Sequence, residues 1–227
     1  MKHIETLTIC LVFLLTGCAT PTSSTFDYKE SQPIPVANEI IVDRPFEDVW
    51  DTLIGNLAKS FFVVNNIEKE SRLINVDFGT DMPEEYVECG TATRTFKSKE
   101  DEVTFSYPVA ADSSYLRGEG NATPHYWVGA VDRHTDLQGK TNVYVAPEGS
   151  NTRVSVNSRY VLSVKTTGQA KFINGLFGTV QGSRIIEPTS AKVSFNTNLP
   201  GTSDGVLCYS KGVLEKQILD MIDVSDR

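Results

Sequence analysis

EIIVDRPFEDVWDTLIGNLAKSFFVVNNIEKESRLINVDF, residues 39–78, is the stretch with the clearest structural pattern in this 227-residue chain. Its first five residues, Glu39 to Asp43, predict a short strand. Pro45 then fits the first position of a helix, where its missing N–H costs nothing. Acidic residues follow in the next turn, where the helix dipole favours negative charge. We therefore predict a strand followed by a helix that begins near Pro45.

This helix is predicted to bury one face. Its apolar residues recur at intervals of three and four, the spacing of a single helical face, and they are Phe46, Val49, Trp50, Leu53, Ile54, Leu57 and Ala58. After the helix, Phe61–Ile67 and Leu73–Phe78 predict two strands joined by a charged turn. The local unit is therefore a strand, a helix and a hairpin.

The unit resembles the opening of helix-grip modules, in which an antiparallel sheet curls around a helix. The matching segments are Val42–Phe46, Val49–Trp50 and Leu73–Phe78. Similar small domains occur in envelope lipoproteins, including a lipoprotein subunit of the outer-membrane β-barrel assembly machinery. The resemblance implies an α+β fold with an antiparallel sheet packed on two helices. A generic α+β domain would show the same periodicity.

Further elements extend the predicted domain over residues 39–227. Thr141–Ala146 and Arg153–Val164 flank a turn, and the alternation of the second segment predicts an antiparallel hairpin with one solvated face. A strand at Ala191–Thr197 and a helix from Ser210 to Ile222 are predicted to complete the domain. We expect all of these elements to belong to one domain.

Two regions lack a sustained period. Residues 108–140 contain scattered Gly, Pro and charge together with aromatic residues, so we expect them to form a long, ordered insertion. Residues 168–188 place apolar side chains among four glycines. We expect this second region to be a loop that packs on its own domain.

The N-terminal residues predict where the protein lies. The mostly apolar run from Thr6 to Leu15 is too short to span a bilayer and ends at small residues, as a cleaved signal peptide does. Leu15-Thr16-Gly17-Cys18 resembles the lipobox of bacterial lipoprotein precursors. The resemblance implies that residues 1–17 are removed and that Cys18 carries a thioether-linked diacylglycerol and an acylated N-terminus. An ordinary signal peptide with an incidental cysteine is the alternative.

Residues 18–38 are expected to tether the domain to its membrane. They are rich in Thr, Ser and Pro and poor in periodic apolar residues, which is typical of a flexible coil. Ala19, rather than Asp, follows Cys18, and resemblance to proteobacterial sorting signals favours the outer membrane, facing the periplasm. The expected partners are the membrane, through the lipid, and an envelope protein.

Charge and cysteine usage agree with that compartment. The formal net charge of −8 repels nucleic acid, so a nucleic-acid-binding function is excluded. Of the four cysteines, the lipobox resemblance implies that Cys10 is removed with the signal peptide and that Cys18 carries lipid. Cys89 and Cys208 remain and are predicted to form a disulfide in the oxidising periplasm. Two separate buried thiols are the alternative.

Residues that could carry catalysis are sparse. The mature chain has two histidines, His125 and His134, and no G-x-S-x-G nucleophile elbow accompanies them, so we predict no catalytic site. Asp132, His134 and Asp136 alternate and would place three possible metal ligands on one side of a strand. In a polar, glycine-rich region the same pattern is more typical of a solvated loop. We therefore expect neither a metal nor another cofactor.

Two functions fit these observations. The first is a non-catalytic interaction or structural module of the cell envelope, which binds a protein partner through a sheet edge or through residues 108–140. The alternative is a carrier that holds a small hydrophobic ligand between helix and sheet, where Trp50, Phe62, Phe78 and Tyr160 would line the cavity. Because large aromatic side chains fill space, their abundance also fits a solid core.

Overall fold

The computed structural model describes residues 21–120, 125–174 and 179–222. The predicted signal peptide and the lipidation site at Cys18 lie outside the described residues. Within the described residues, the helices lack the length and apolar character that crossing a bilayer requires.

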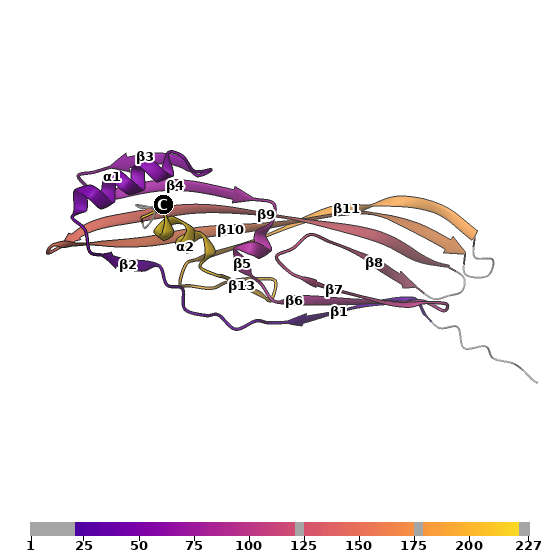
Figure 1. The fold of residues 1–227 in the computed structure, drawn as a ribbon. Helices are drawn as coiled ribbons and strands as arrows, with labels where there is room; N and C mark the ends of the chain where they lie inside the picture. The colour runs from indigo at the N-terminus through magenta and orange to yellow at the C-terminus, as the bar shows by residue number, and fades with distance from the viewer. Residues whose placement is uncertain (1–20, 121–124, 175–178, 223–227) are drawn as a thin grey trace, which may run out of the picture.

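Two long strands give the molecule an elongated shape (Figure 1). β9 (His125–Glu148) and β10 (Asn151–Asn174) contain 24 residues each and form an antiparallel hairpin that is paired along its whole length. At about 3.4 Å per residue, each strand extends over roughly 80 Å. β11 (Thr179–Asn196) pairs with β10, so three strands form an arm along the molecule.

The strands of the described residues form three antiparallel sheets. The largest has seven strands in the order β11-β10-β9-β4-β3, with β2 paired to β10 and β8 paired to β9; the other two have the orders β1-β6-β7 and β12-β13-β5. The remaining strands are β1 (Ser23–Lys29), β2 (Glu39–Val42), β3 (Val63–Glu68), β4 (Leu73–Thr80), β5 (Val87–Glu88), β6 (Thr91–Lys97), β7 (Glu102–Pro108), β8 (Ser113–Gly120), β12 (Gly201–Ser203) and β13 (Val206–Ser210).

Helices contribute little of the structure. They are α1 (Phe46–Leu57), α2 (Val213–Asp220) and the 3₁₀ turn η1 (Pro83–Glu85). The predicted strand, helix and hairpin are confirmed as β2, α1 and the β3–β4 pair. α1 begins directly after Pro45 and buries the expected face, which includes Val49, Trp50, Leu53 and Leu57.

The predicted α+β fold, with one antiparallel sheet packed on two helices, is wrong. The structure is mostly β, with 64% of the described residues in strands and 12% in helices, and it has several antiparallel sheets. Both helices lie at one end of the long hairpin (Figure 1). The long strands escaped prediction because inward positions of β9 hold polar or small residues, among them Arg133, Thr135 and Gly139. Along β9, buried and exposed positions alternate, but apolar and polar residues do not.

Three segments expected to lie outside the sheets are paired strands. Ser23–Lys29, in the expected tether, forms β1 and pairs with β6. Residues 113–120 and 125–140, in the expected insertion, form β8 and most of β9, which are part of the main sheet. Residues 168–174 and 179–188, expected as a loop, continue β10 and β11. β1 and the first half of β11 have mostly exposed side chains, so they lack the alternation that marks a half-buried strand.

Gly139 makes room for the core where α2 meets the sheet. Strand register places it between Phe78 of β4 and Tyr160 of β10. A Cβ at this position would lie 3.4 Å from Phe78, 3.5 Å from Leu214 and 3.6 Å from Tyr160. The two aromatic rings and Leu214 of α2 therefore fill the space that the glycine leaves.

The predicted disulfide between Cys89 and Cys208 is confirmed. Both cysteines are fully buried. Their neighbours Glu88 and Tyr209 are paired residues of β5 and β13. The bond therefore joins β13 to the residue that directly follows β5, and the two cysteines are 119 residues apart in sequence.

Candidate functional site

The four aromatic residues predicted to line a ligand cavity are buried in the core and pack on other rings. The centroid distances are 5.6 Å for Trp50 and Phe46, 6.3 Å for Phe62 and Phe78, and 5.4 Å for Tyr160 and Phe195. The pocket considered below is lined by other residues. In this structure, the four side chains fill space between the helices and the sheet.

Asp132, His134 and Asp136 lie on the exposed face of β9, in the alternation that the sequence suggested. Among the residues that the structure describes, no three His, Cys, Asp or Glu side chains gather closely enough to hold a metal ion. His134 Nδ1 is instead 3.1 Å from Asp112 Oδ2. The side chain of His125 lies outside the described part of the chain.

Asp112 fixes the segment before β8 to β9. Its Oδ1 accepts hydrogen bonds from the Thr135 backbone N–H at 2.6 Å and from the Thr135 hydroxyl at 2.8 Å. Partial burial raises the pKa of Asp112, but the bonds from Thr135 and His134 together hold that pKa below its ordinary value. The side chain is therefore a carboxylate at neutral pH.

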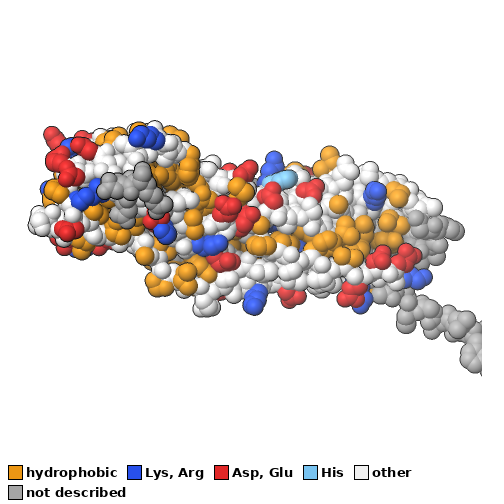
Figure 2. Space-filling model, in the orientation of Figure 1, with side chains coloured by type: hydrophobic (Ala, Val, Ile, Leu, Met, Phe, Trp, Pro, Cys, Tyr) orange, Lys and Arg blue, Asp and Glu red, His pale blue; other side chains and the backbone are white. Residues whose placement is uncertain are grey.

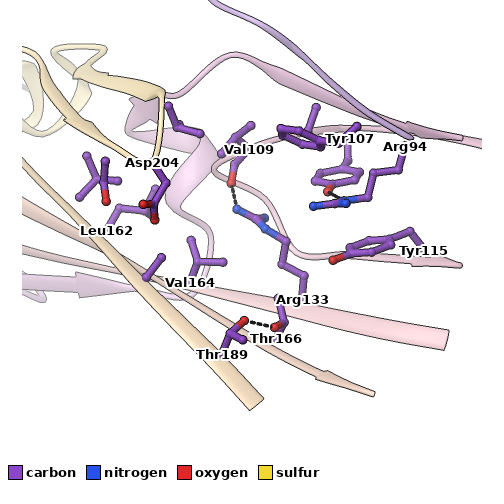
Figure 3. A pocket seen from close by; sticks show the side chains of 16 residues that line it. Arg94, Tyr107, Val109, Tyr115, Arg133, Leu162, Val164, Thr166, Thr189 and Asp204 are labelled. Carbon is purple, nitrogen blue, oxygen red and sulfur yellow. Dashed lines mark hydrogen bonds between the residues drawn. The ribbon is translucent and has the colours of Figure 1, made fainter. Parts of the chain in front are cut away.

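A pocket of about 200 Å³ lies between two layers of strands (Figure 3). One wall is the β1–β6–β7 sheet, and the other is the face of the main sheet formed by β8–β11; the β12–β13 hairpin contributes Ser203, Asp204 and Val206 at one end. The first wall carries Phe26, Ala92, Arg94 and Tyr107, and the second carries Tyr115, Arg133, Leu162, Val164, Thr166, Thr189, Ala191 and Val193. We treat this pocket as the candidate site because it joins an apolar surface to two guanidinium groups.

Strand β6 brings Arg94 against three aromatic residues. Register places it opposite Phe26 of β1, and its Cζ lies 4.5 Å from the Phe26 ring and 4.4 Å from the Tyr115 ring. Its Nε donates a hydrogen bond of 3.0 Å to the hydroxyl of Tyr107. Cation–π contacts of this kind contribute about 0.5–2 kcal/mol each, so the guanidinium is held at the pocket wall.

Arg133 is an inward-facing residue of β9 and is only 7% exposed. Its Nη1 donates to the Ala111 carbonyl at 2.5 Å, and its Nη2 donates to the Val109 carbonyl. Both acceptors lie in the coil between β7 and β8, and Figure 3 shows the side chain reaching across toward Val109. Burial lowers the pKa of Arg133 below its ordinary value, but a guanidinium remains charged at neutral pH. The residue therefore buries a fixed positive charge beside the pocket.

These two positive charges lack an ion-pair partner. In the described residues, neither Arg94 nor Arg133 takes part in a salt bridge. Tyr107 and Tyr115 stack beside them with ring centroids 6.0 Å apart and planes at 7°. Burial raises the pKa of Tyr115 above its ordinary value, so its hydroxyl remains a protonated donor at neutral pH. This part of the lining therefore presents positive charge and hydroxyl groups.

The part of the lining that comes from β10 and β11 is apolar up to one pair of threonines. Leu162 and Val193 are buried and face each other across the β10–β11 register, as Val164 and Ala191 do. Beyond them, the hydroxyls of Thr166 and Thr189 are 2.5 Å apart (Figure 3). This arrangement can hold a molecule that has an apolar body and a group that accepts hydrogen bonds from a cation.

The edge of β11 is a second surface of interest. In the described residues, β11 is the end strand of its sheet. Val180 and Ile185, in its first half, are 58% and 66% exposed. Figure 2 shows hydrophobic side chains gathered on one face of this half of the molecule.

Sequence reasoning did not identify Arg94, Tyr107, Tyr115 or Arg133 as site residues. They lie on four strands, and the pairing of β8 with β9 and the packing of the β1–β6–β7 sheet bring them together. One sequence feature beside the pocket does indicate local structure. The Asp204-Gly205 pair is typical of a tight hairpin turn, and it joins β12 to β13. Comparison with known proteins found no match to a family model, to a curated protein or to a solved structure.

Proposed function

We propose that this protein is a non-catalytic binding module of the bacterial cell envelope, which holds a small, partly apolar ligand in the pocket beside Arg94 and Arg133. The observation that carries the proposal is a pocket in which the apolar surface of β10 and β11 is bordered by two guanidinium groups, and neither group has an ion-pair partner among the described residues. Ligand sites typically combine a mostly apolar lining with a few polar groups that fix orientation. We therefore keep the carrier hypothesis, but we place the ligand between two β-sheets and not between a helix and a sheet.

The proposal includes a lipid anchor on Cys18 and attachment to the outer membrane, facing the periplasm. Support comes from the Leu15-Thr16-Gly17-Cys18 sequence and from Ala19. Growth with labelled palmitate should label the wild-type protein and leave a Cys18→Ala variant unlabelled. Equal labelling of both proteins would exclude the anchor.

Native mass spectrometry of the full chain, extracted from its own membranes with an amphipathic polymer, tests the ligand. We expect an adduct beyond the Cys18 lipid that is lost on denaturation. Ala191→Phe places a ring in the pocket and should remove the adduct. Lys192→Phe places the same ring on the exposed side of β11 and should retain it. An adduct that survives both changes would place the ligand elsewhere, and its absence from the wild type would count against the proposal.

The exposed edge of β11 favours a second candidate function, the binding of an envelope protein partner. Unpaired strand edges with apolar side chains accept a strand from another chain. Ile185→Lys should reduce recovery of a cross-linked partner from membranes, while Lys171→Ala, an exposed change on β10, should not. Equal recovery with both variants would exclude this edge as the interface.

A further inference from the structure

We propose that the ligand of this pocket is an amphipathic monocarboxylate whose carboxylate is bound by Arg94. This inference rests on the proposed binding function and specifies the chemical class of the ligand. It is carried by the different ways in which the two arginines are held, by the size of the pocket and by the apolar side chains of β10 and β11 that line it with them.

Arg94 has hydrogen-bonding capacity to offer a ligand. Its Nε is occupied by Tyr107, and the rings of Phe26 and Tyr115 lie against its guanidinium. Its two terminal nitrogens donate no hydrogen bond to any residue in the described part of the chain. Figure 3 shows the Arg94 side chain directed into the pocket from the Tyr107 side. The edge formed by these two nitrogens matches the two oxygens of a carboxylate.

Arg133 has a different role. Both of its terminal nitrogens donate to backbone carbonyls, those of Val109 and Ala111, so they are not available to a ligand in this geometry. The charge remains, and in a partly buried setting it attracts an anion more strongly than it would in water. We therefore assign Arg94 as the direct carboxylate ligand and Arg133 as a fixed charge that supports it.

Pocket size and lining set the rest of the ligand. A cavity of about 150 Å³ holds benzene, so a pocket of about 200 Å³ suits a molecule somewhat larger than benzene. Leu162, Val164 and Val193 would contact its apolar body. A phosphate would leave a further charged oxygen against this apolar wall, whereas a carboxylate places both oxygens on one guanidinium edge. A short aryl or alkyl carboxylic acid fits these requirements.

The experiment compares 3-phenylpropionate with 3-phenylpropionamide, a neutral molecule of nearly the same shape. Isothermal titration of the full chain at low ionic strength should show at least about tenfold tighter binding of the carboxylate, the factor expected for charge-assisted hydrogen bonds. Arg94→Gln should remove this preference, so that the acid and the amide bind alike. Arg159→Gln removes the same charge from an exposed position on β10 and should keep the preference.

The outcomes separate this inference from the proposed function. Equal binding of acid and amide to the wild type, abolished by Ala191→Phe, would support a ligand pocket and overturn the carboxylate assignment. A preference for the acid that persists in Arg94→Gln would also overturn it. Binding of neither compound would contradict both proposals. Because the acid–amide comparison is made on the wild type, it decides the charge preference even if Arg94→Gln fails to fold.

Discussion

Replacement of Glu215 by alanine should destabilise the fold much more than its replacement by glutamine. Glu215 lies in the first turn of α2 and is fully buried. Its Oε1 accepts hydrogen bonds from the hydroxyls of Tyr160 at 2.9 Å and Thr197 at 2.8 Å. Its Oε2 accepts one from Ser210 at 3.3 Å. The carboxylate therefore joins α2 to β10, to the end of β11 and to β13.

The size of the effect follows from what each substitution leaves behind. Alanine removes the acceptor of the Tyr160 and Ser210 hydroxyls, whereas the Thr197 hydroxyl keeps the Ser158 carbonyl at 3.3 Å. Each buried hydroxyl that loses its partner costs about 1–3 kcal/mol. Contributions within one network are not additive. We therefore expect Glu215→Ala to lower the free energy of unfolding by about 3–5 kcal/mol. A glutamine oxygen can accept the bonds from Tyr160 and Thr197, and its NH₂ can donate to Ser210, so Glu215→Gln should cost only about 1 kcal/mol.

Urea unfolding of the full chain, with the disulfide intact in every variant, measures these differences. Asp51→Ala, on the exposed side of α1, is the control and should change stability by less than about 0.5 kcal/mol. The reasoning fails if Glu215→Ala costs less than about 1 kcal/mol, because the Tyr160 and Ser210 hydroxyls would then not depend on this acceptor. It also fails if Glu215→Gln lowers the free energy of unfolding as much as Glu215→Ala does, because lost hydrogen-bond acceptors would then not explain the destabilisation.

Further predictions concern pH, covalent linkage and backbone packing. The folded-state pKa of Asp112 is below the ordinary value of 3.8, so its carboxylate stabilises the fold above pH 3.8 and loses this contribution as the pH falls through the folded-state pKa. Asp112→Asn should lower the melting temperature slightly near neutral pH, and its difference from the wild type should shrink below pH 3.8. Replacement of Cys89 and Cys208 together by serine should cost about 4 kcal/mol in urea unfolding because the closed loop is long, and thiol titration of denatured, unreduced wild type should detect neither cysteine. Gly118→Ala should destabilise by about 1–3 kcal/mol, because its Cβ would lie 2.6 Å from a backbone oxygen. Gly55→Ala, in α1 with nothing within 4 Å, should stabilise by about 0.5–1 kcal/mol in the same assay.

Local patterns in the sequence predicted the elements whose buried face is apolar. α1 was recognisable because its inward residues repeat at helical spacing. The first half of β10 was recognisable because Val154, Val156 and Tyr160 are buried at alternating positions. In each case the hydrophobic pattern and the burial pattern coincide, so sequence alone indicates the element.

The rest of the fold depends on partners that lie far away in sequence. β9 turns Arg133 and Thr135 inward, and they are satisfied by the coil before β8 rather than by an apolar core. β1 has the composition of a linker, but Phe26 and Tyr28 align with β6 once the strands pair. The candidate site could not be predicted for the same reason, because Arg94 meets its aromatic partners and the other pocket residues only when β6 packs beside β8 and β9.

The pocket and the covalent framework share one junction. The Tyr28 hydroxyl accepts a hydrogen bond from the Leu207 N–H at 3.0 Å and donates one to the Leu207 carbonyl at 3.3 Å, which joins β1 to β13. The Cys89–Cys208 bond joins the same β13 to the residues directly before β6. β6 carries Arg94, and Val206, the first residue of β13, lines the pocket. These links therefore hold the strand that carries Arg94 to the hairpin at the end of the pocket. An oxidising compartment therefore supports the geometry of the proposed ligand site as well as the stability of the fold.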